Sequence, residues 1–163
     1  MRELHVPSPA DVPPNPVRGV PLDSRYQAVE ERIDGELVPY AEEVRELWRA
    51  AIATAPWTGP ALWLRGDLHP ANILVRDGRL AGVIDFGDMT GGDPATDLAT
   101  AWLTFDAEGR AAFIAALDYD DDTWARARGW AVSLSTAMIV GSAPASLMHR
   151  VGVGGIEQAL LDR

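Results

Sequence analysis

Three short apolar segments lie close together in the middle of a sequence that otherwise has helical periodicity. They are residues 61–64, 73–75 and 80–84. Residues 76–79, Arg-Asp-Gly-Arg, join the last two, and Asp-Gly is typical of a hairpin turn. At these segments the apolar residues change from the period of a helix to that of a strand. The sequence therefore predicts an α+β fold that is mainly helical, with a short β-hairpin near its centre.

Helices are predicted on both sides of these strands. Apolar residues recur at spacings of three and four over residues 39–55, and a shorter helix is expected after an N-cap at residues 23–24. Asp93 and Pro94 favour another helix start. The glycine-rich residues 152–155 are interpreted as a loop. Further helices are expected over about 107–117, 122–140 and 155–162.

Composition narrows the classes of partner. The net charge is −10, all 14 basic residues are arginine, and there is no lysine, so no basic stripe is available to bind nucleic acid. An acidic surface favours cationic partners, although it also serves solubility. The absence of cysteine suits the cytoplasm. Residues 131–140, the longest largely apolar run, fall far short of the ~20 residues that span a membrane.

Two polar loops lie at the ends of the predicted strands. Residues 64–72 contain Asp67 and Asn72, and residues 84–88 contain Asp85. Carboxylate and amide oxygens are ligands that Mg²⁺ accepts while it keeps several waters. A further carboxylate is needed to accept or orient the proton of an attacking hydroxyl. The loops together provide the groups that phosphoryl transfer from ATP requires.

The spacing of these residues is that of a kinase centre. Asp67 is followed after four residues by Asn72, and Asp85-Phe86-Gly87 comes downstream. A structural alternative exists for each loop, since Asp67 could cap a turn, Asn72 could satisfy backbone groups and Asp85 could simply end a strand. Both loops in this order, with a hairpin between them, favour the phosphotransferase interpretation.

The sequence resembles the aminoglycoside phosphotransferase family in three motifs. They are Gly66-Asp67-Leu68-His69-Pro70-Ala71-Asn72-Ile73-Leu74, Val83-Ile84-Asp85-Phe86-Gly87-Asp88 and Gly92-Asp93-Pro94-Ala95-Thr96-Asp97-Leu98-Ala99. The resemblance implies the C-terminal lobe of a kinase-like fold, with Mg²⁺ and ATP used to phosphorylate a hydroxyl of a small molecule. It implies that Asp67 is the base, that Asn72 and Asp85 bind magnesium, and that Asp97 is a buried structural carboxylate.

Two further residues of the first loop are expected to support it. The family usually has histidine where this chain has Arg65, and that position supports the loop. His69 is also interpreted as loop support, because no second histidine or cysteine is placed to share a metal with it. His5 and His149 have no partner in the sequence and are expected at the surface.

The resemblance also implies a lobe that this sequence does not contain. Residues 1–22, with six prolines between positions 7 and 21, are expected to be an extended connector from a missing N-terminal lobe. Residues 23–163 are expected to be the C-terminal, catalytic and substrate-binding lobe. Without a lysine for the nucleotide phosphates, the alternative is a catalytically incomplete lobe that acts as a binding module or forms a homodimer through its exposed lobe interface.

An acidic cluster precedes one of the predicted helices. It lacks the glycine and the terminal glutamate of a calcium loop, so acidic residues at a helix N-terminus are the favoured interpretation. In the resembled family, acidic residues of the C-terminal helices contact cationic substrates. The cluster is therefore a weaker candidate for substrate binding, and its members are Asp118, Asp120, Asp121 and Asp122.

Overall fold

The computed structural model describes residues 1–162, and its strands form two separate antiparallel pairs. β2 (Ile73–Arg76) and β3 (Arg79–Val83) form the predicted hairpin. Asp77 and Gly78 have φ values of 51° and 72°, as a tight hairpin turn requires. β1 (Leu62–Leu64) pairs instead with β4 (Thr90–Gly92), a strand that the sequence does not predict, because Thr-Gly-Gly has no apolar pattern.

The proline-rich segment contains no helix within residues 7–21, as predicted, and it lies along β1 and β4. The backbone N–H of Trp63 donates to the carbonyl of Val6 at 2.8 Å, and that of Ser8 donates to Ala61 at 2.9 Å. Further along, the N–H of Asp93 donates to the carbonyl of Gly19 at 3.2 Å. These bonds fix the start of the chain against the strands that carry the first polar loop.

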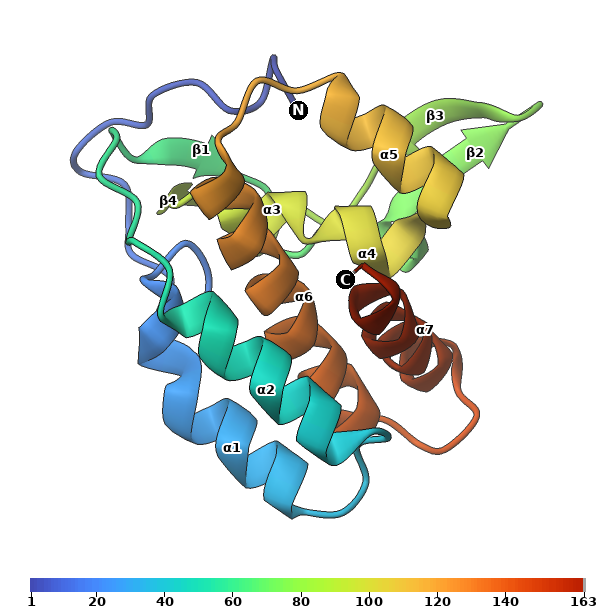
Figure 1. Ribbon diagram of the computed structural model, residues 1–163. Coiled ribbons are helices and arrows are strands. Elements are labelled where there is room, and N and C mark those ends of the chain that lie inside the picture. Colours follow the sequence, from blue (N-terminus) through green and yellow to red (C-terminus); the bar gives the residue numbers. More distant parts are fainter. Residues whose placement is uncertain (163) are drawn as a thin grey trace.

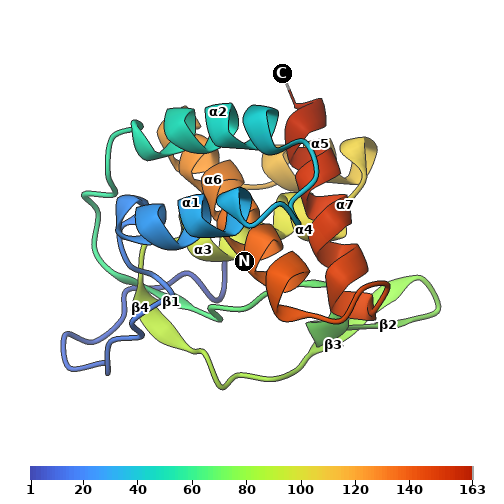
Figure 2. The same ribbon diagram turned by 90° about the horizontal axis from the view of Figure 1, so that it is seen from below.

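The helices form a layer on one side of the strands. In Figure 2 the two strand pairs lie along one edge of the molecule and α2 (Ala41–Ile52) lies on the opposite side. α6 (Asp121–Gly141) lies between them and packs against α1 (Tyr26–Asp34), which follows the short η1 (Leu22–Arg25). Trp48 of α2 and Trp130 of α6 are fully buried in the core that these helices share. The α+β, mainly helical fold class is confirmed.

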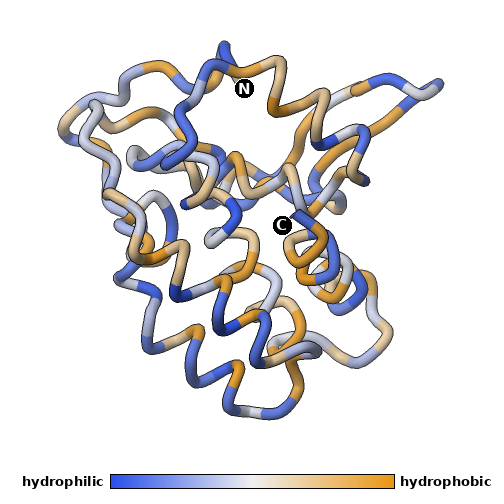
Figure 3. The backbone as a smooth tube through the Cα atoms, viewed as in Figure 1, coloured by the Kyte–Doolittle hydropathy of each residue, from blue (hydrophilic) through white to orange (hydrophobic). Residues whose placement is uncertain are grey.

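Amphipathic patterning accounts for the outer helices of this layer. Along α1 and α2, blue and orange stretches alternate in Figure 3, as expected when each turn has one hydrophilic and one hydrophobic side. Val29 and Ile33 of α1 and Val44 of α2 are buried, whereas Glu31 of α1 and Glu43 of α2 are exposed. Among residues 1–162, no helix has the combined length and apolar character of a membrane span.

Two of the later helices begin at aspartate caps. Asp106 accepts a hydrogen bond from the N–H of Gly109 at 2.9 Å at the start of α5 (Ala107–Ala115). Asp120 accepts one from Thr123 at 2.7 Å and caps α6, close to the predicted start. Where one helix is expected after Asp93, the structure has two short helices, α3 (Ala95–Leu98) and α4 (Thr100–Thr104).

The glycine-rich residues 152–155 lie inside α7 (Leu147–Leu161), so the prediction of a loop there is wrong. The physical reason is close packing of α7 on α6, which Figure 1 shows side by side. A Cβ at Gly152 would lie 2.8 Å from the carbonyl oxygen of Ser135, and one at Gly155 would lie 2.8 Å from Leu103 Cδ2. Glycine is therefore needed for the helix contact, which outweighs its low helix propensity.

Candidate active site

Asp97 holds the backbone of the first polar loop, which runs from β1 to η2 (Pro70–Asn72). Its two carboxylate oxygens accept hydrogen bonds from the N–H groups of Arg65 at 2.7 Å and Gly66 at 2.8 Å. Gly66 has a φ of +87°, and a Cβ there would collide with the carbonyl of Asp88. The buried carboxylate and the glycine together bring the first loop directly against the second.

Asp67 lies among the side chains of two arginines and a histidine. One carboxylate oxygen accepts from Arg18 Nη2 at 3.2 Å, the other contacts His69 Nε2 at 3.1 Å, and Arg65 Nη1 lies 3.8 Å away. Burial alone would raise the pKa of Asp67, but the hydrogen bond from His69 and the charges of His69, Arg18 and Arg65 lower it. The carboxylate is therefore ionised at neutral pH.

Asn72 is buried behind Asp67, and its amide is held by the same loop. Nδ2 donates to the backbone carbonyl of Asp67 at 3.0 Å and lies 3.1 Å from His69 Nε2. Because the bond to the Asp67 carbonyl uses the nitrogen of the amide, Oδ1 is the atom that can serve as a ligand.

The hairpin register brings Asp85 next to Asn72. The N–H of Ile84 donates to the carbonyl of Asn72 at 3.0 Å, and Arg65 Nη2 donates to the carbonyl of Ile84 at 2.7 Å. Asp85 follows directly, with an exposed side chain and a φ of 61°. A non-glycine residue in this region carries a cost of about 1–3 kcal/mol, and such strain concentrates at functional sites.

Asn72 and Asp85 fit a magnesium ion by donor type. An amide oxygen and a carboxylate, both hard donors, suit Mg²⁺ because it retains several waters. Within residues 1–162 there is no group of three or more histidine, aspartate or glutamate side chains that could hold a metal. The candidate site is therefore one amide just before β2 and one carboxylate shortly after β3, at the same end of the hairpin, rather than a carboxylate cage.

Arg18 and Asp88 complete the surroundings of Asp67, and sequence reasoning missed both. Arg18 Nε lies 4.0 Å from Asp88 Oδ2, while Asp88 Oδ1 accepts from Asn15 Nδ2 at 3.2 Å. Arg18 precedes Asp67 by 49 residues in a segment read only for its prolines. No local spacing could have found it; the absence of lysine, which leaves arginine as the only strong cation, was the one available signal.

The side chain of His5 is only 1% exposed, so the expectation that this residue lies at the surface is wrong. Its Nε2 lies 3.3 Å from Asp97 Oδ2, and its Nδ1 lies 2.6 Å from the hydroxyl of Tyr119. The cause is the pairing of residues 6–8 with β1, which carries His5 over the buried carboxylate. The start of the chain therefore supports the first polar loop through Asp97.

The acidic cluster spans the end of the connection from α5 and the first turn of α6. Asp120 caps α6, and its pKa is lowered by the hydrogen bonds from Thr123. Tyr119, in the middle of the cluster, contacts His5 and so reaches the back of Asp97 rather than the side chain of Asp67. A role of the cluster in substrate binding stays a prediction.

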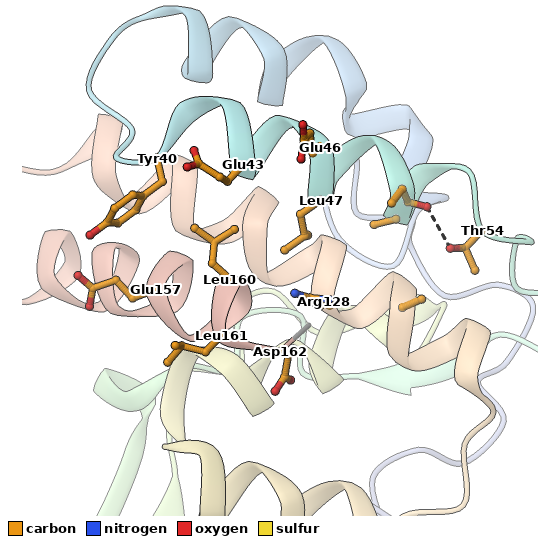
Figure 4. Close-up of a pocket in the computed structure, with 13 residues that line it drawn as sticks. Tyr40, Glu43, Glu46, Leu47, Thr54, Arg128, Glu157, Leu160, Leu161 and Asp162 are labelled. Atoms are coloured by element: carbon orange, nitrogen blue, oxygen red, sulfur yellow. Dashed lines mark hydrogen bonds between the residues drawn. The ribbon is translucent and has the colours of Figure 1, made fainter.

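A groove of about 1260 Å³ lies elsewhere, between α2, α6 and α7. Figure 4 shows side chains of α2 and α7 on its two sides, with Arg128 of α6 between them. Its acidic members are Glu43, Glu46, Glu157 and Asp162. None of the residues predicted from the two polar loops lines this groove. The volume of the groove therefore does not make it the candidate active site.

A family model described as APH, phosphotransferase enzyme family, matches residues 1–130. The chain belongs to this phosphotransferase family. The matched range includes both polar loops, Asp97 and the segment that carries Arg18. Enzymes of the APH family generally use ATP and Mg²⁺. No curated protein matches the chain.

Proposed function

We propose that this chain transfers the γ-phosphoryl group of ATP to a hydroxyl of a small molecule, with Asp67 as base and Asn72 and Asp85 as magnesium ligands. The observation that carries the proposal is the joining of the two polar loops. The side chain of Asn72 donates to the backbone carbonyl of Asp67, and the backbone carbonyl of Asn72 accepts from the N–H of Ile84. The three oxygen groups thereby come from adjacent backbone segments.

The proposed role of Asp67 follows from its charge state. Its lowered pKa makes it a weak base that is always ionised, so it orients the acceptor hydroxyl and takes the proton as the hydroxyl attacks. Phosphoryl transfer has a loose transition state, in which positioning matters more than strong basicity. A bound Mg²⁺ would neutralise charge on the phosphates.

The nucleotide side of the proposed reaction lacks one usual group. Kinases place a lysine on the α- and β-phosphates, and this sequence has no lysine. An arginine supplies charge with a different geometry. We therefore expect weak MgATP binding by the 163-residue chain, measured by calorimetry, and a micromolar dissociation constant would contradict this expectation.

The test is phosphoryl transfer from γ-labelled ATP, with Mg²⁺, to a panel of hydroxyl compounds. Asp67→Asn should lower the rate by about 10²–10⁴, the range for loss of a general base. Glu108→Gln is the matched control, because Glu108 is an exposed carboxylate in the first turn of α5 and belongs to neither polar loop nor the acidic cluster. Transfer that survives in Asp67→Asn would show that Asp67 is not the base.

A binding or self-associating module is the second candidate, and exposed apolar side chains favour it. The hairpin and the second loop carry five of them, at 43–69% exposure: Leu74, Val75, Leu80, Ile84 and Phe86. Such a patch marks an interaction surface. Light scattering that gives a dimer mass, reversed by Val75→Glu, would favour this candidate. A monomer mass would count against self-association.

A further inference from the structure

Arg18 is held at the catalytic carboxylate by the backbone on both sides of it. The N–H of Val17 donates to Asn15 Oδ1 at 2.9 Å, and that of Gly19 donates to Thr96 Oγ1 at 3.2 Å. Gly19 has a φ of +67° and lies so close to Gly92 that a side chain at either position would collide with the other segment. The position of Arg18 is therefore built into the fold.

The guanidinium of Arg18 has donors to spare. It has five N–H groups, of which one reaches Asp67 at 3.2 Å and another reaches the carbonyl of Val17 at a long 3.5 Å. Its Nε is buried and has no hydrogen-bond partner among residues 1–162. A side chain that is 20% exposed leaves room for a small molecule to approach.

Two more arginines extend the positive charge away from Asp67. Arg25 ends η1 and Arg32 lies in α1, where it donates to the carbonyl of Ser133 in α6 at 3.2 Å. The pKa of Arg25 is lowered by burial and by the charge of Arg18, and that of Arg32 by burial and by the charges of Arg25 and Arg18. The charges of Arg18, Arg25 and Arg32 therefore act on one another, and the last two arginines add to the positive potential around Arg18.

We propose that Arg18, backed by Arg25 and Arg32, binds a carboxylate or phosphate group of the acceptor beside Asp67. A planar guanidinium recognises either oxyanion by paired hydrogen bonds. The acceptor would then carry an anionic group close to the hydroxyl that is phosphorylated. The local charge beside the base, rather than the acidic net charge, decides this class. The proposal rests on the proposed function, because it assigns the charge of that acceptor.

The test uses the Nε–Hε NMR signals of arginine, which report every strong cation because the chain has no lysine. Inorganic phosphate and acetate are titrated into the 163-residue protein. Saturable shifts confined to Arg18, Arg25 and Arg32 are expected. Arg18→Gln should raise the half-saturating phosphate concentration by about tenfold or more, equivalent to at least one charge-assisted hydrogen bond. Shifts that are linear in phosphate, or equal at all arginines, would overturn the proposal.

Matched variants separate the site from general charge effects. Arg49→Gln also removes an arginine paired to a carboxylate, since Arg49 Nε lies 3.6 Å from Glu30, but it lies on α2 and should leave binding unchanged. Arg18→Lys keeps the charge and loses the planar fork, so it should bind phosphate more weakly than wild type and more tightly than Arg18→Gln. An Arg49 effect as large as the Arg18 effect would overturn the proposal.

The nucleotide is the other source of such an anion. Half-saturation of the Arg18 signal at a lower concentration of phosphate than of MgATP assigns the subsite to the acceptor, and the reverse order overturns that assignment. Failure of the proposed function is seen separately, as an absence of Mn²⁺ broadening at Asn72 and Asp85. Broadening there without phosphate binding at Arg18 would reject the anion subsite and leave the phosphotransferase proposal intact.

Discussion

Alanine substitutions in α7 give opposite predictions for neighbouring glycines. A Cβ at Gly154 would meet nothing within 4 Å, so Gly154→Ala should only relieve the low helix propensity of glycine. That is worth about 0.8–1 kcal/mol. For a chain of 163 residues the melting temperature should rise by about 2–4 °C.

Gly152→Ala should have the reverse effect. Its Cβ would lie 2.8 Å from the Ser135 carbonyl, 2.9 Å from Ile139 Cγ1 and 3.0 Å from Met138 Cβ. The first of these is backbone of α6 and cannot rotate away, so an overpacking cost near 3 kcal/mol is expected. After the propensity gain of about 1 kcal/mol, a net loss of about 2 kcal/mol remains. The melting temperature should fall by about 4–8 °C.

The assay is thermal unfolding followed by circular dichroism, with urea unfolding as the check on free energy. Wild type, Gly152→Ala and Gly154→Ala are compared in one buffer. If residues 152–155 were a surface loop, both substitutions would have small effects of the same sign. Equal changes in the two variants, or a stabilised Gly152→Ala, would refute the account of how α7 packs on α6.

Three further predictions concern the charged groups. Asp97→Asn should lower the free energy of unfolding, measured with urea, by about 2–3 kcal/mol. Asp97 accepts from two loop N–H groups, and in the variant one of them would face the NH₂ group of the asparagine, which is also a donor. A loss below about 0.5 kcal/mol would contradict this prediction. Arg18→Gln should raise the pKa of Asp67, followed by carbon NMR titration, because one of the cations that lower it is lost; an unchanged pKa would mean that Arg18 does not act on Asp67. Burial raises the pKa of Asp162, but bonds from Arg110 and Trp102 lower it overall. Stability from this group is thus present above its unfolded pKa of about 3.9 and is lost as the pH falls through the lower folded value. The stability difference between wild type and Asp162→Asn should therefore vanish at acid pH, and a constant difference from pH 7 to pH 2 would contradict the ion pair.

The parts of the fold that could be predicted are those decided by neighbouring residues. The Asp77-Gly78 pair favours a hairpin turn whatever surrounds it. In the same way, the amphipathic pattern of residues 39–55 predicts a helix without reference to the rest of the chain. β4 could not be predicted, because Thr-Gly-Gly is a strand only when β1 lies beside it. The prediction of a loop at the glycines of α7 failed for the same reason, because these glycines are required by the close contact with α6 and not by a turn.

The candidate site divides in the same way. Asp67, Asn72 and Asp85 could be proposed from spacing alone, because each loop is continuous in sequence. Arg18 and His5 could not be found, since they reach Asp67 and Asp97 across 49 and 92 residues. Charged side chains brought in by a segment without helix or long strand leave no periodic signal. Such contacts shift the pKa of Asp67, the proposed base, whereas the local motif is what identifies Asp67 as a candidate.

The central claim is that Asn72 and Asp85 form the metal side of a phosphotransferase centre whose base is Asp67. Its most direct test replaces Mg²⁺ by paramagnetic Mn²⁺ and follows line broadening in NMR spectra of the protein. The account predicts that substoichiometric Mn²⁺ broadens the side-chain amide of Asn72 and the backbone amide of Asp85, and that Asp85→Asn removes the effect. Broadening confined to residues 118–122, with Asn72 unaffected, would contradict it.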